Sequence, residues 1–363
     1  MNLTRMEVDG FRGLSEVSFE PHRKLTLIDG PNGSGKSSVL EAIHCLSTGH
    51  SYRSRKPREL VARGKEAFTA TARLREDEGK REHRIGLSRR RDGSLDFRVD
   101  FRPVESIAEA TRLLPVKILS PDSHALLQEG PDERRRFLDW GVFHVEPRFL
   151  ESWRRFRRAL SQRNQALRDV RPDSEVVSWN EQLARHGTEV DAYRRAYVAR
   201  LQSALISRMA KLRSAFGVSL RYRGGWPAEE ALTDVLERNL DHHRRMRTTT
   251  DGPHRGELVV TTDGVPVRQE LSRGQQKTLT YLMHLSQLDV MRQGGDRRAI
   301  VLCDDLLSEV DTANADDIVE QLLEASGQVF VAGVEVVRLL ERGGSLFHMK
   351  QGRMLSHEPS DSA

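Results

Sequence analysis

The sequence predicts an α/β fold with a mixed sheet and an antiparallel sheet, into which a mostly helical subdomain is inserted. Three observations predict this fold. A glycine-rich loop at 30–37 follows an apolar strand pattern and precedes an apolar-periodic helix pattern. The middle of the chain, from about residue 122 to 245, is rich in Arg, Glu, Ala, Leu and Gln. Beyond about residue 256 strand patterns return, so the two ends of the chain should meet in one domain.

Strand patterns dominate the first part of the chain. Short apolar bursts at 3–9 and 25–29 predict two strands. Between 67 and 104 polar and apolar residues alternate in patches such as FTATARL and LDFRVDF, separated by turns at Gly79 and Gly93. These patches predict an antiparallel sheet with one buried face.

The rest of the chain combines helices and strands. Apolar residues at three- and four-residue steps predict a helix over 146–169 and one long amphipathic helix over 179–216. The stretches ELVVTTDGVPV, RRAIVLCDDLL and GQVFVAGVEVV predict further strands. We therefore predict four segments: 1–121, the first part of the main domain; 122–249, the helical subdomain; 250–355, the second part of the main domain; and 356–363, a disordered tail.

The composition narrows the class of protein. No apolar run approaches the roughly 18 residues of a membrane span, and the polar N-terminus is unlike a signal peptide, so we expect a cytoplasmic protein. The net charge of +5 permits a polyanionic partner without requiring one. Cys45 and Cys303 stand in apolar-periodic segments and not in metal-ligand spacing, which predicts buried packing thiols.

The loop GPNGSGKS matches the phosphate-loop pattern in the required strand-loop-helix context. Glycines let the backbone turn tightly, so that successive amide groups point at a phosphate, and Lys36 would neutralise the β- and γ-phosphates of ATP. Ser37 is expected to hold Mg²⁺. The predicted nucleotide-binding residues of the loop are Gly30, Pro31, Asn32, Gly33, Ser34, Gly35, Lys36, Ser37 and Ser38.

Two adjacent carboxylates end the predicted strand 299–303. Asp304 would lie at the edge of the sheet, where it can reach the metal ion on Ser37, and Asp305 would orient or deprotonate the attacking water. Related ATPases more commonly have Glu at the second position. Because Asp305 is one methylene shorter, we expect slow turnover, as in a switch and not in a fast motor.

The stretch ELSRGQQK resembles the LSGGQ signature of the ATP-binding-cassette (ABC) superfamily, with Arg273 in place of the first glycine. That resemblance implies that the signature closes over the γ-phosphate held by a second copy, so that ATP joins two chains in a two-fold dimer. The residues expected to act in trans are Ser272, Arg273, Gly274 and Gln275.

Three further features follow the pattern of that superfamily. SEVD resembles the loop that bridges the two sites of a dimer, which points to Ser308 and Asp311. Glu335 stands where transporter-type ATPases carry a switch histidine, and we include it with Asp305 and Lys36 among the catalytic candidates. The start of the chain, with Arg12 in GFRGL, resembles the SMC and double-strand-break-repair ATPases, where this arginine approaches the nucleotide. The expected fold is therefore an ABC/SMC-type P-loop ATPase head.

The insertion is much shorter than the coiled coils of those relatives. Together with LSPDSHALLQEGPDERRRFLDW, SQRNQALR and DGPHRGEL, it closely resembles the RecF family of bacterial recombination mediators, over residues 1 to about 355. The resemblance implies an ATP-dependent protein that binds gapped DNA at single-strand/double-strand junctions and helps load RecA with RecO and RecR, in replication-fork repair and SOS induction. The alternatives are a structural SMC-type chromosome ATPase, an ABC ATPase subunit of a transporter and a nuclease.

Several basic clusters could contact DNA. The run 50–58 contains no acid, and its candidate DNA-binding residues are Arg53, Arg55, Lys56 and Arg58. The segment 73–91 also contains eight basic residues against four acidic ones. The arginines at 134–136 and 154–158 compete with these runs, or they serve ion pairs within the chain. Aromatic residues are not interleaved with the basic runs, so we expect contacts with the DNA backbone and no base stacking.

Overall fold

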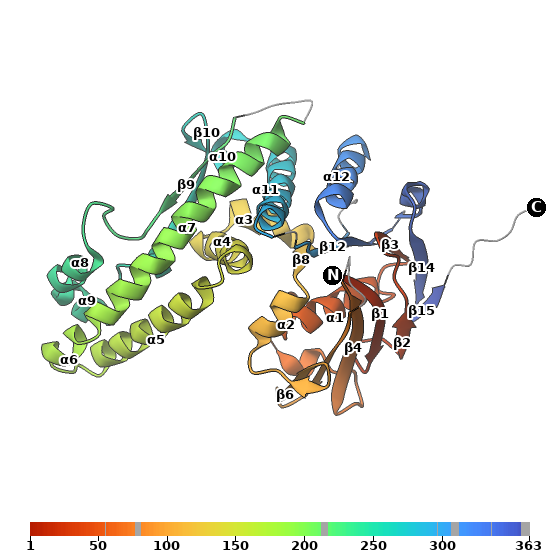
Figure 1. The fold of residues 1–363 in the computed structure, drawn as a ribbon, viewed down its shortest axis with the longest axis horizontal. Coiled ribbons are helices and arrows are strands. Elements are labelled where there is room, and N and C mark those ends of the chain that lie inside the picture. Colours follow the sequence, from red (N-terminus) through yellow and green to blue (C-terminus); the bar gives the residue numbers. More distant parts are fainter. Residues whose placement is uncertain are drawn as a thin grey trace, which may run out of the picture. The chain divides into compact units, whose positions relative to one another are not determined.

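The computed structural model describes residues 1–54, 56–76, 81–211, 217–295, 297–305, 312–334 and 336–356, with the backbone alone at 312–316 and 356. The chain divides into two compact units, Met1–Ser123 with Gly295–Ala363, and His124–Gly294 (Figure 1). The first unit joins the two ends of the chain, as the return of strand patterns near the C-terminus predicted.

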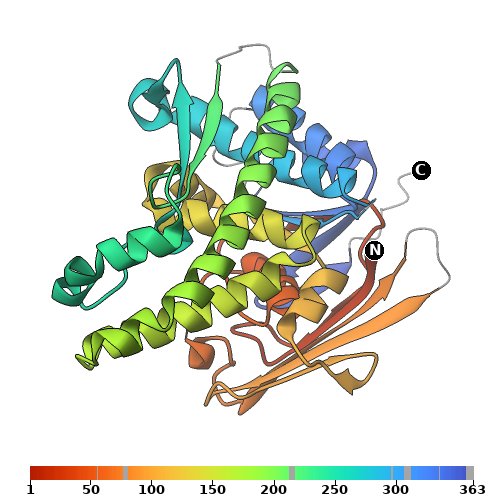
Figure 2. The same cartoon turned by 60° about the vertical axis from the view of Figure 1, so that its left-hand side comes forward.

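The first unit contains an antiparallel sheet of order β2-β1-β4-β5-β6-β7. Its strands are β1 (Asn2–Asp9), β2 (Val17–Phe19), β4 (Ala67–Arg75), β5 (Glu82–Arg90), β6 (Leu95–Val99) and β7 (Arg102–Pro103). Figure 2 shows the long strands β4 and β5, in orange, lying side by side. Burial alternates along β4 from Phe68 to Arg75, as the period-two pattern predicted, so one face packs on the core and the other faces outward.

The second sheet of this unit is mixed, of order β15-β14-β3-β13-β12-β8. Its strands are β3 (Leu25–Asp29), β8 (Val116–Leu119), β12 (Ile300–Asp304), β13 (Gln328–Ala332), β14 (Ser345–Lys350) and β15 (Arg353–Ser356). The central strands run parallel, and only β15 pairs antiparallel among the described strands of this sheet. All five side chains of β12 and of β13 are buried, which is the burial expected for strands of a parallel sheet covered on both faces.

Helix α1 (Lys36–Thr48) belongs to one hydrophobic core with side chains of both sheets. Val39, Leu40 and Ile43 of this helix are fully buried, and so are the cysteines, Cys45 and Cys303, as predicted. Burial raises the pKa of both thiols. Among the described residues, the other helices of this unit are η1 (Pro57–Glu59), α2 (Ile107–Leu113), α12 (Thr312–Ala325) and η5 (Val336–Arg342), while η2 (Pro121–His124) spans the boundary between the two units in the chain.

The second unit is mostly helical. Its long helices are α4 (Pro131–Val145), α5 (Phe149–Arg168), α7 (Asn180–Met209) and α11 (Arg273–Gln293), and its short ones are α3 (Ala125–Gln128), α6 (Asp173–Val177), α8 (Leu232–Arg238), α9 (Leu240–Met246), η3 (Pro253–Arg255) and α10 (Val267–Glu270). The helices predicted at 146–169 and 179–216 are present as α5 and α7, and 212–216 lie outside the described residues.

The segment predicted at 250–355 is divided between the two units. Strand β10 (Glu257–Thr262) pairs with β9 (Ser219–Arg223) and β11 (Val265–Pro266) in a small sheet of the second unit. Helix α11 packs against α7 and α4 of the same unit. Residues 250–294 therefore belong to the helical unit and not to the first unit, because β10 pairs with β9 and α11 packs against α7 and α4.

Two of the sequence motifs specific to the resembled family build this second unit. Arg163, fully buried in α5, donates to Asn180 Oδ1 at 2.8 Å and to Thr249 Oγ1 at 2.8 Å. Arg194 of α7 donates to the carbonyl of Pro253 at 2.6 Å and forms an ion pair with Asp139 at 2.8 Å. SQRNQALR and DGPHRGEL thus supply hydrogen bonds that join helices to the loop before β10.

Candidate nucleotide site and signature helix

The loop Gly30–Ser37 joins β3 to α1, and Gly30 and Gly35 of this loop have backbone conformations that other residues rarely adopt. Gly30 has φ of 144°, and a Cβ there would lie 2.4 Å from the carbonyl oxygen of Met349. Gly35 has φ of 110° and precedes the first helical residue. The backbone amides at the start of a helix are free to bind an anion, and the helix dipole favours negative charge there.

Lys36, the first residue of α1, is buried, and the loop wraps around its side chain. Its Nζ donates to the carbonyl oxygens of Gly30 at 2.6 Å and Pro31 at 3.1 Å. The loop therefore curls around the ammonium group, which lies at the start of α1. This arrangement concentrates positive charge beside the helix N-terminus, as a phosphate-binding loop requires.

Asp304 ends β12, at the carboxyl edge of the parallel strands, as predicted. It is buried, and its Oδ2 accepts a hydrogen bond of 2.9 Å from the hydroxyl of Tyr52. Its Oδ1 is buried without a hydrogen-bond partner in the described part of the chain. A buried carboxylate oxygen without a partner is costly unless a cation binds it. A hard oxygen ligand of this kind fits Mg²⁺, which Asp304 would hold together with Ser37 in the first turn of α1.

Asp305 follows with a left-handed backbone, φ 49°. Its amide donates to the carbonyl of Ala332 at 2.9 Å, which anchors the turn to the end of the neighbouring strand β13. Burial and the charge of Asp304 raise the pKa of Asp305, while the charges of Lys36 and Arg53 act to lower it. A carboxylate with a raised pKa is suited to accept a proton from water, and Lys36 is one of the cations whose charge acts on it.

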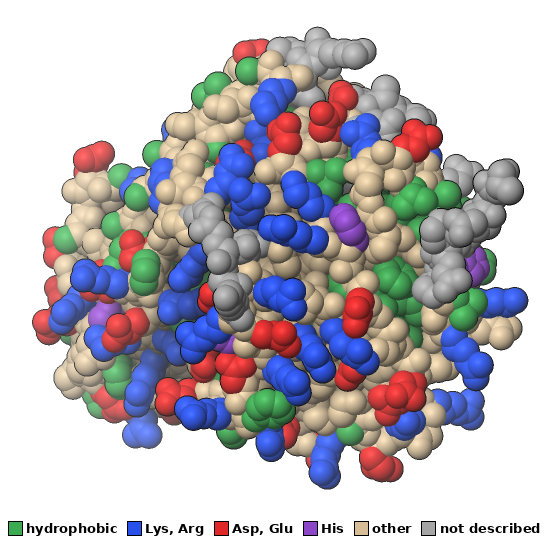
Figure 3. Space-filling view, turned by 45° about the vertical axis from the view of Figure 1, so that its right-hand side comes forward, with side chains coloured by type: hydrophobic (Ala, Val, Ile, Leu, Met, Phe, Trp, Pro, Cys, Tyr) green, Lys and Arg blue, Asp and Glu red, His purple; other side chains and the backbone are tan. Residues whose placement is uncertain are grey.

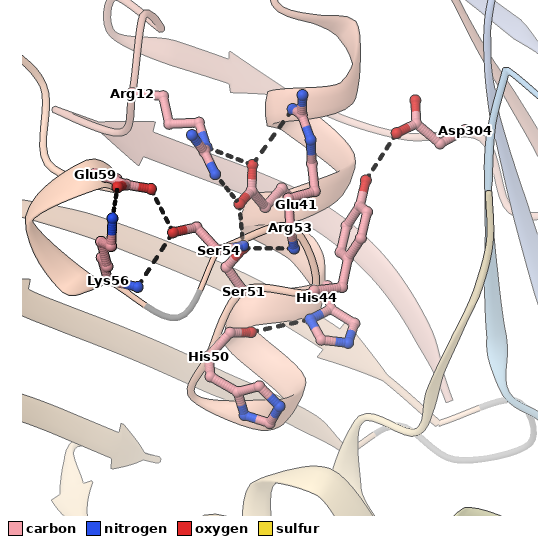
Figure 4. A network of polar contacts seen from close by, with 11 residues as sticks. Arg12, Glu41, His44, His50, Ser51, Arg53, Ser54, Lys56, Glu59 and Asp304 are labelled. Atoms are coloured by element: carbon pink, nitrogen blue, oxygen red, sulfur yellow. Dashed lines mark hydrogen bonds and ion pairs between the residues drawn. The ribbon is translucent and has the colours of Figure 1, made fainter. Parts of the chain in front are cut away.

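A buried carboxylate, Glu41, organises the loop that follows α1 (Figure 4). Arg12 donates to both of its oxygens, at 2.6 and 2.7 Å, and the Ser51 hydroxyl also donates to it. Arg53 lies 3.7 Å from the same carboxylate. Ser51 in turn accepts hydrogen bonds from the backbone amides of Arg53 and Ser54, both at 2.9 Å. Residues 51–54 are therefore fixed between Glu41 and Asp304.

Sequence reasoning missed Glu41, Ser51 and Tyr52. One signal was present, since Glu41 is the only acid within the otherwise apolar stretch SVLEAIHCLS. Tyr52 gave none, because it lies in the run HSYRSRKPR, which we interpreted as a basic surface.

The candidate DNA-binding residues of that run are not equivalent. Arg53 is exposed but lies 3.7 Å from the Glu41 carboxylate, whereas Lys56, also exposed, pairs with Glu59 at 3.3 Å. Arg58 is exposed, and Arg55 lies outside the described residues. The competing arginines at 134–136 form ion pairs within the chain, with Glu257, Asp132 and Glu133. On the face drawn in Figure 3, Lys and Arg side chains are numerous, with acidic side chains among them.

The predicted signature begins α11. Ser272 is the N-cap, its Oγ accepts from the Gln275 amide at 3.3 Å, and Gln275 Oε1 accepts from the Ser272 amide at 2.9 Å. Ser272, Arg273, Gly274 and Gln275 are exposed, and a Cβ at Gly274 would meet no atom within 4 Å. The start of this 21-residue helix is thus rigidly capped and open to a ligand from outside.

Three other candidates, Ser308, Asp311 and Glu335, lie outside the described residues. Across the described ranges, no group of three or more His, Cys, Asp and Glu side chains could hold a metal ion. Within the same ranges, no helix has an apolar run long enough to cross a membrane.

Comparisons with known proteins identify the family of this chain. The family model described as the RecF/RecN/SMC N-terminal domain matches residues 2–353. The DNA replication and repair protein RecF of Thioalkalivibrio sulfidiphilus is 38% identical over 357 residues, covering 98% of this chain and 99% of the relative. The RecF proteins of Stutzerimonas stutzeri and Shewanella pealeana are 36% and 34% identical over similar lengths.

Solved structures extend the comparison. A structure of the recombination mediator protein RecF with ATP, in the RecFOR pathway, superposes with a TM-score of 0.89 at 25% identity, covering 98% of both chains. An Smc head bound to the C-winged helix domain of ScpA has a TM-score of 0.59 at 16% identity over 100% of this chain and 99% of that one, which shows a shared fold. The chain belongs to the RecF/RecN/SMC N-terminal domain family and, within it, to the RecF DNA replication and repair proteins.

Proposed function

We propose that this protein is an ATP-dependent DNA-binding recombination mediator, which binds gapped DNA at single-strand/double-strand junctions. In this role it acts in the cytoplasm with RecR and RecO, which together help load RecA onto DNA during repair, replication restart and the SOS response. The proposal is supported by membership of the RecF family and by the similarity to a RecF structure with ATP that is assigned to the RecFOR pathway.

One observation carries the proposal. Each chain contains an incomplete nucleotide site at the phosphate loop and, elsewhere, a signature helix, α11, whose N-terminus is exposed. Lys36 lies within the phosphate loop, its charge acts on Asp305, and the neighbouring Asp304 has an Oδ1 without a described hydrogen-bond partner. Ser272 and its neighbours cap α11 but remain exposed. Each chain therefore offers one half of a phosphate-binding site at Gly30–Ser37 and the other half at the exposed, capped start of α11, and ATP would join the two halves across two copies.

In the proposed cycle, ATP and Mg²⁺ bind to Gly30–Ser38, with Ser37 and Asp304 on the metal ion and Arg12 nearby. Ser272 to Gln275 of a second copy cover the γ-phosphate, and Ser308 and Asp311 lie at the dimer contact. Asp305 accepts the proton of the attacking water, and Glu335 is a further catalytic candidate. Slow, DNA-dependent hydrolysis removes the shared phosphate and separates the dimer, so ATP acts as a switch.

The dimer is tested by light scattering of an Asp305→Asn variant, which should retain ATP and hydrolyse it poorly. ATP with Mg²⁺ should double its apparent mass, and an unchanged mass would contradict the sandwich. Lys36→Arg should lose nucleotide binding. Ser272→Arg should keep nucleotide binding, measured with a fluorescent ATP analogue, and lose dimer formation.

DNA binding is tested with a gapped duplex at increasing salt. Contacts with phosphates release counterions, so the logarithm of the binding constant should fall steeply with the logarithm of salt concentration. A slope near zero would contradict a phosphate-dominated interface. Replacing Arg58 and Lys56 by Gln tests the exposed part of the run 50–58, and Arg185→Gln on α7 is a matched control, because it is also exposed.

A further inference from the structure

The outward face of the antiparallel sheet carries three arginines in direct register. Arg5 of β1 is the cross-strand partner of Arg73 on β4, and Arg73 is the partner of Arg84 on β5. Like charges directly opposite one another on a sheet repel and destabilise the pairing. A row of three arginines is therefore an arrangement that the sheet itself does not favour.

Acidic neighbours offset this row only in part. Arg5 pairs with Glu7 at 2.8 Å and Glu20 at 3.5 Å, and Arg73 lies 3.9 Å from Glu82. On β6, Arg98 pairs with Asp96 at 3.0 Å. These pairs are exposed, and exposed pairs contribute little because water and salt screen them. The Arg84 guanidinium lies instead over the ring of Phe101, 5.3 Å from its centroid.

A glycine opens a hollow beside the row. Gly86, two residues after Arg84, lies between Thr71 and Arg98 in the next register position. Because Gly86 has no side chain, the face is recessed there, and the hollow has a volume of about 350 Å³. Its charged lining residues are Arg5, Arg73, Arg84, Arg98 and one acid, Glu7.

Phe101 stands at the rim of this hollow in a strained turn. Asp100 and Phe101 form the two-residue connection between β6 and β7, with φ of 48° and 67°. Turns of this kind favour Gly at the second position, because a side chain with positive φ is crowded. Phe101 is nevertheless 71% exposed. The ring contacts the Arg84 guanidinium and is otherwise mostly open to solvent, so it adds little to the fold. A strained aromatic ring at the rim of an arginine-lined hollow points to a function.

We propose that this face, defined by Arg5, Arg73, Arg84, Arg98 and Phe101 and here called the arginine row, binds single-stranded nucleic acid. The arginines contact phosphates, and the Phe101 ring stacks on a base at the hollow. Four arginines and one glutamate line the hollow beside an exposed aromatic ring. This lining matches the chemistry of single strands, in which unpaired bases offer their flat faces next to a charged backbone. The proposal rests on the proposed DNA-binding function and places the single-stranded part of the DNA on the described sheet.

From the sequence we expected contacts with the DNA backbone and no stacking of aromatic side chains on bases, so base stacking on Phe101 departs from that expectation. In the sequence, Phe101 is separated from Arg5 and Arg73 by many residues, so no basic run is interleaved with aromatics. Pairing of β1, β4, β5 and β6 brings them to one face.

The test uses the full chain with ATP and Mg²⁺ and two fluorescent strands of equal charge, an oligothymidylate of about 15 nucleotides and an abasic strand of the same length. Stacking predicts that Phe101→Ala weakens binding of the thymidylate by about tenfold and leaves binding of the abasic strand unchanged. Phe101→Trp should restore thymidylate binding, and Phe101→Leu should not, because only Trp offers an aromatic face.

The arginines are tested in the same assay. Arg73→Gln and Arg84→Gln should each weaken binding of both strands. Each should also reduce the slope of the logarithm of the binding constant against the logarithm of salt concentration by about 0.7. Val170→Ala is the matched control for Phe101, because Val170 is also exposed and has φ of 55°, and Arg185→Gln is the control for the arginines. Equal unfolding temperatures for all variants would show that the exposed substitutions leave the fold intact.

Three outcomes would overturn the inference. Unchanged binding by the Phe101 and arginine variants would exclude the arginine row, and equal loss on both strands after Phe101→Ala would exclude stacking. If Phe101→Ala weakened binding of a polyglutamate peptide and not of thymidylate, the partner would be an acidic protein. Binding of gapped duplex by the wild type separates the two proposals. If the wild type does not bind gapped duplex, the proposed function is wrong. If it does, and the Phe101 and arginine variants bind thymidylate as tightly as the wild type, only the inference about the arginine row is wrong.

Discussion

The hydroxyl of Tyr52 donates a 2.9 Å hydrogen bond to Asp304 Oδ2, joining residues 252 positions apart in the chain. Burial, together with the neighbouring charge of Asp304, raises the pKa of Tyr52, so this hydroxyl remains a donor at neutral pH. The bond ties the loop after α1 to the end of β12. It also leaves Asp304 Oδ1 as the oxygen available to a metal ion.

We predict that Tyr52→Phe lowers the free energy of unfolding of the nucleotide-free protein by about 2 kcal/mol, because a buried carboxylate loses a hydrogen-bond donor. Urea denaturation followed by circular dichroism measures the loss. Tyr193→Phe is the matched control, since the Tyr193 ring packs against Phe149 and should need no hydroxyl. Equal stability of wild type and Tyr52→Phe would show that the bond contributes nothing.

Removal of Arg12 should leave the buried Glu41 carboxylate without the guanidinium that donates to both of its oxygens. We predict that Arg12→Ala costs about 3 kcal/mol of unfolding free energy, because the buried carboxylate loses its closest cation and retains the Ser51 hydroxyl and the more distant Arg53. Glu41→Gln in the Arg12→Ala background should recover part of that loss. Arg5→Ala, which breaks exposed pairs with Glu7 and Glu20, should cost less than about 1 kcal/mol. A larger loss in the double variant than in Arg12→Ala would contradict this account.

Two glycines of the phosphate loop should differ in their tolerance of alanine. Gly30→Ala places a Cβ 2.4 Å from the Met349 carbonyl oxygen, whereas a Cβ at Gly33 would meet no atom within 4 Å. Gly33→Ala should therefore cost only the backbone strain of positive φ, about 1 kcal/mol. Gly30→Ala should cost clearly more, because the backbone of β14 must move. Urea denaturation of both variants makes the comparison, and the reverse order would refute it.

Stability should fall on acidification partly because of His44. Burial and the nearby His50 lower the pKa of His44 from 6.5 to about 4. The unfolded chain therefore binds a proton between these values that the folded chain excludes, so this contribution is present above pH 6.5 and is lost as the pH falls toward 4. His44→Gln should reduce the slope of unfolding free energy against pH in this window by up to about 1.4 kcal/mol per pH unit.

His254 in the second unit provides an independent comparison. Burial lowers its pKa to about 4 as well, so His254→Gln should reduce the slope in the same direction. Denaturation curves at several pH values between 4 and 7, recorded for both variants, check the prediction. A slope equal to that of the wild type in both would contradict the assigned cause.

The sequence determined the local elements and the residues next to them. GPNGSGKS predicted the phosphate loop between β3 and α1, and SRGQ predicted the start of α11. The acids after IVLC predicted Asp304 at a sheet edge. These features could be predicted because strand and helix periodicity and N-cap residues act over only a few positions in the chain. The same local patterns did not predict that β10 pairs with β9, which places residues 250–294 in the helical unit.

Only the tertiary structure decided which distant residues meet. Tyr52 and Asp304, Arg12 and Glu41, and the register of Arg5, Arg73 and Arg84 all depend on how strands pair and how α1 packs between the sheets. Such contacts are fixed by burial of apolar faces and by strand register, and both are properties of the whole fold. The run 50–58, which the sequence suggested as a basic surface, therefore supplies Tyr52 as a hydrogen-bond donor to Asp304. Arg5, Arg73 and Arg84, which lie far apart in the sequence, are neighbours on three paired strands.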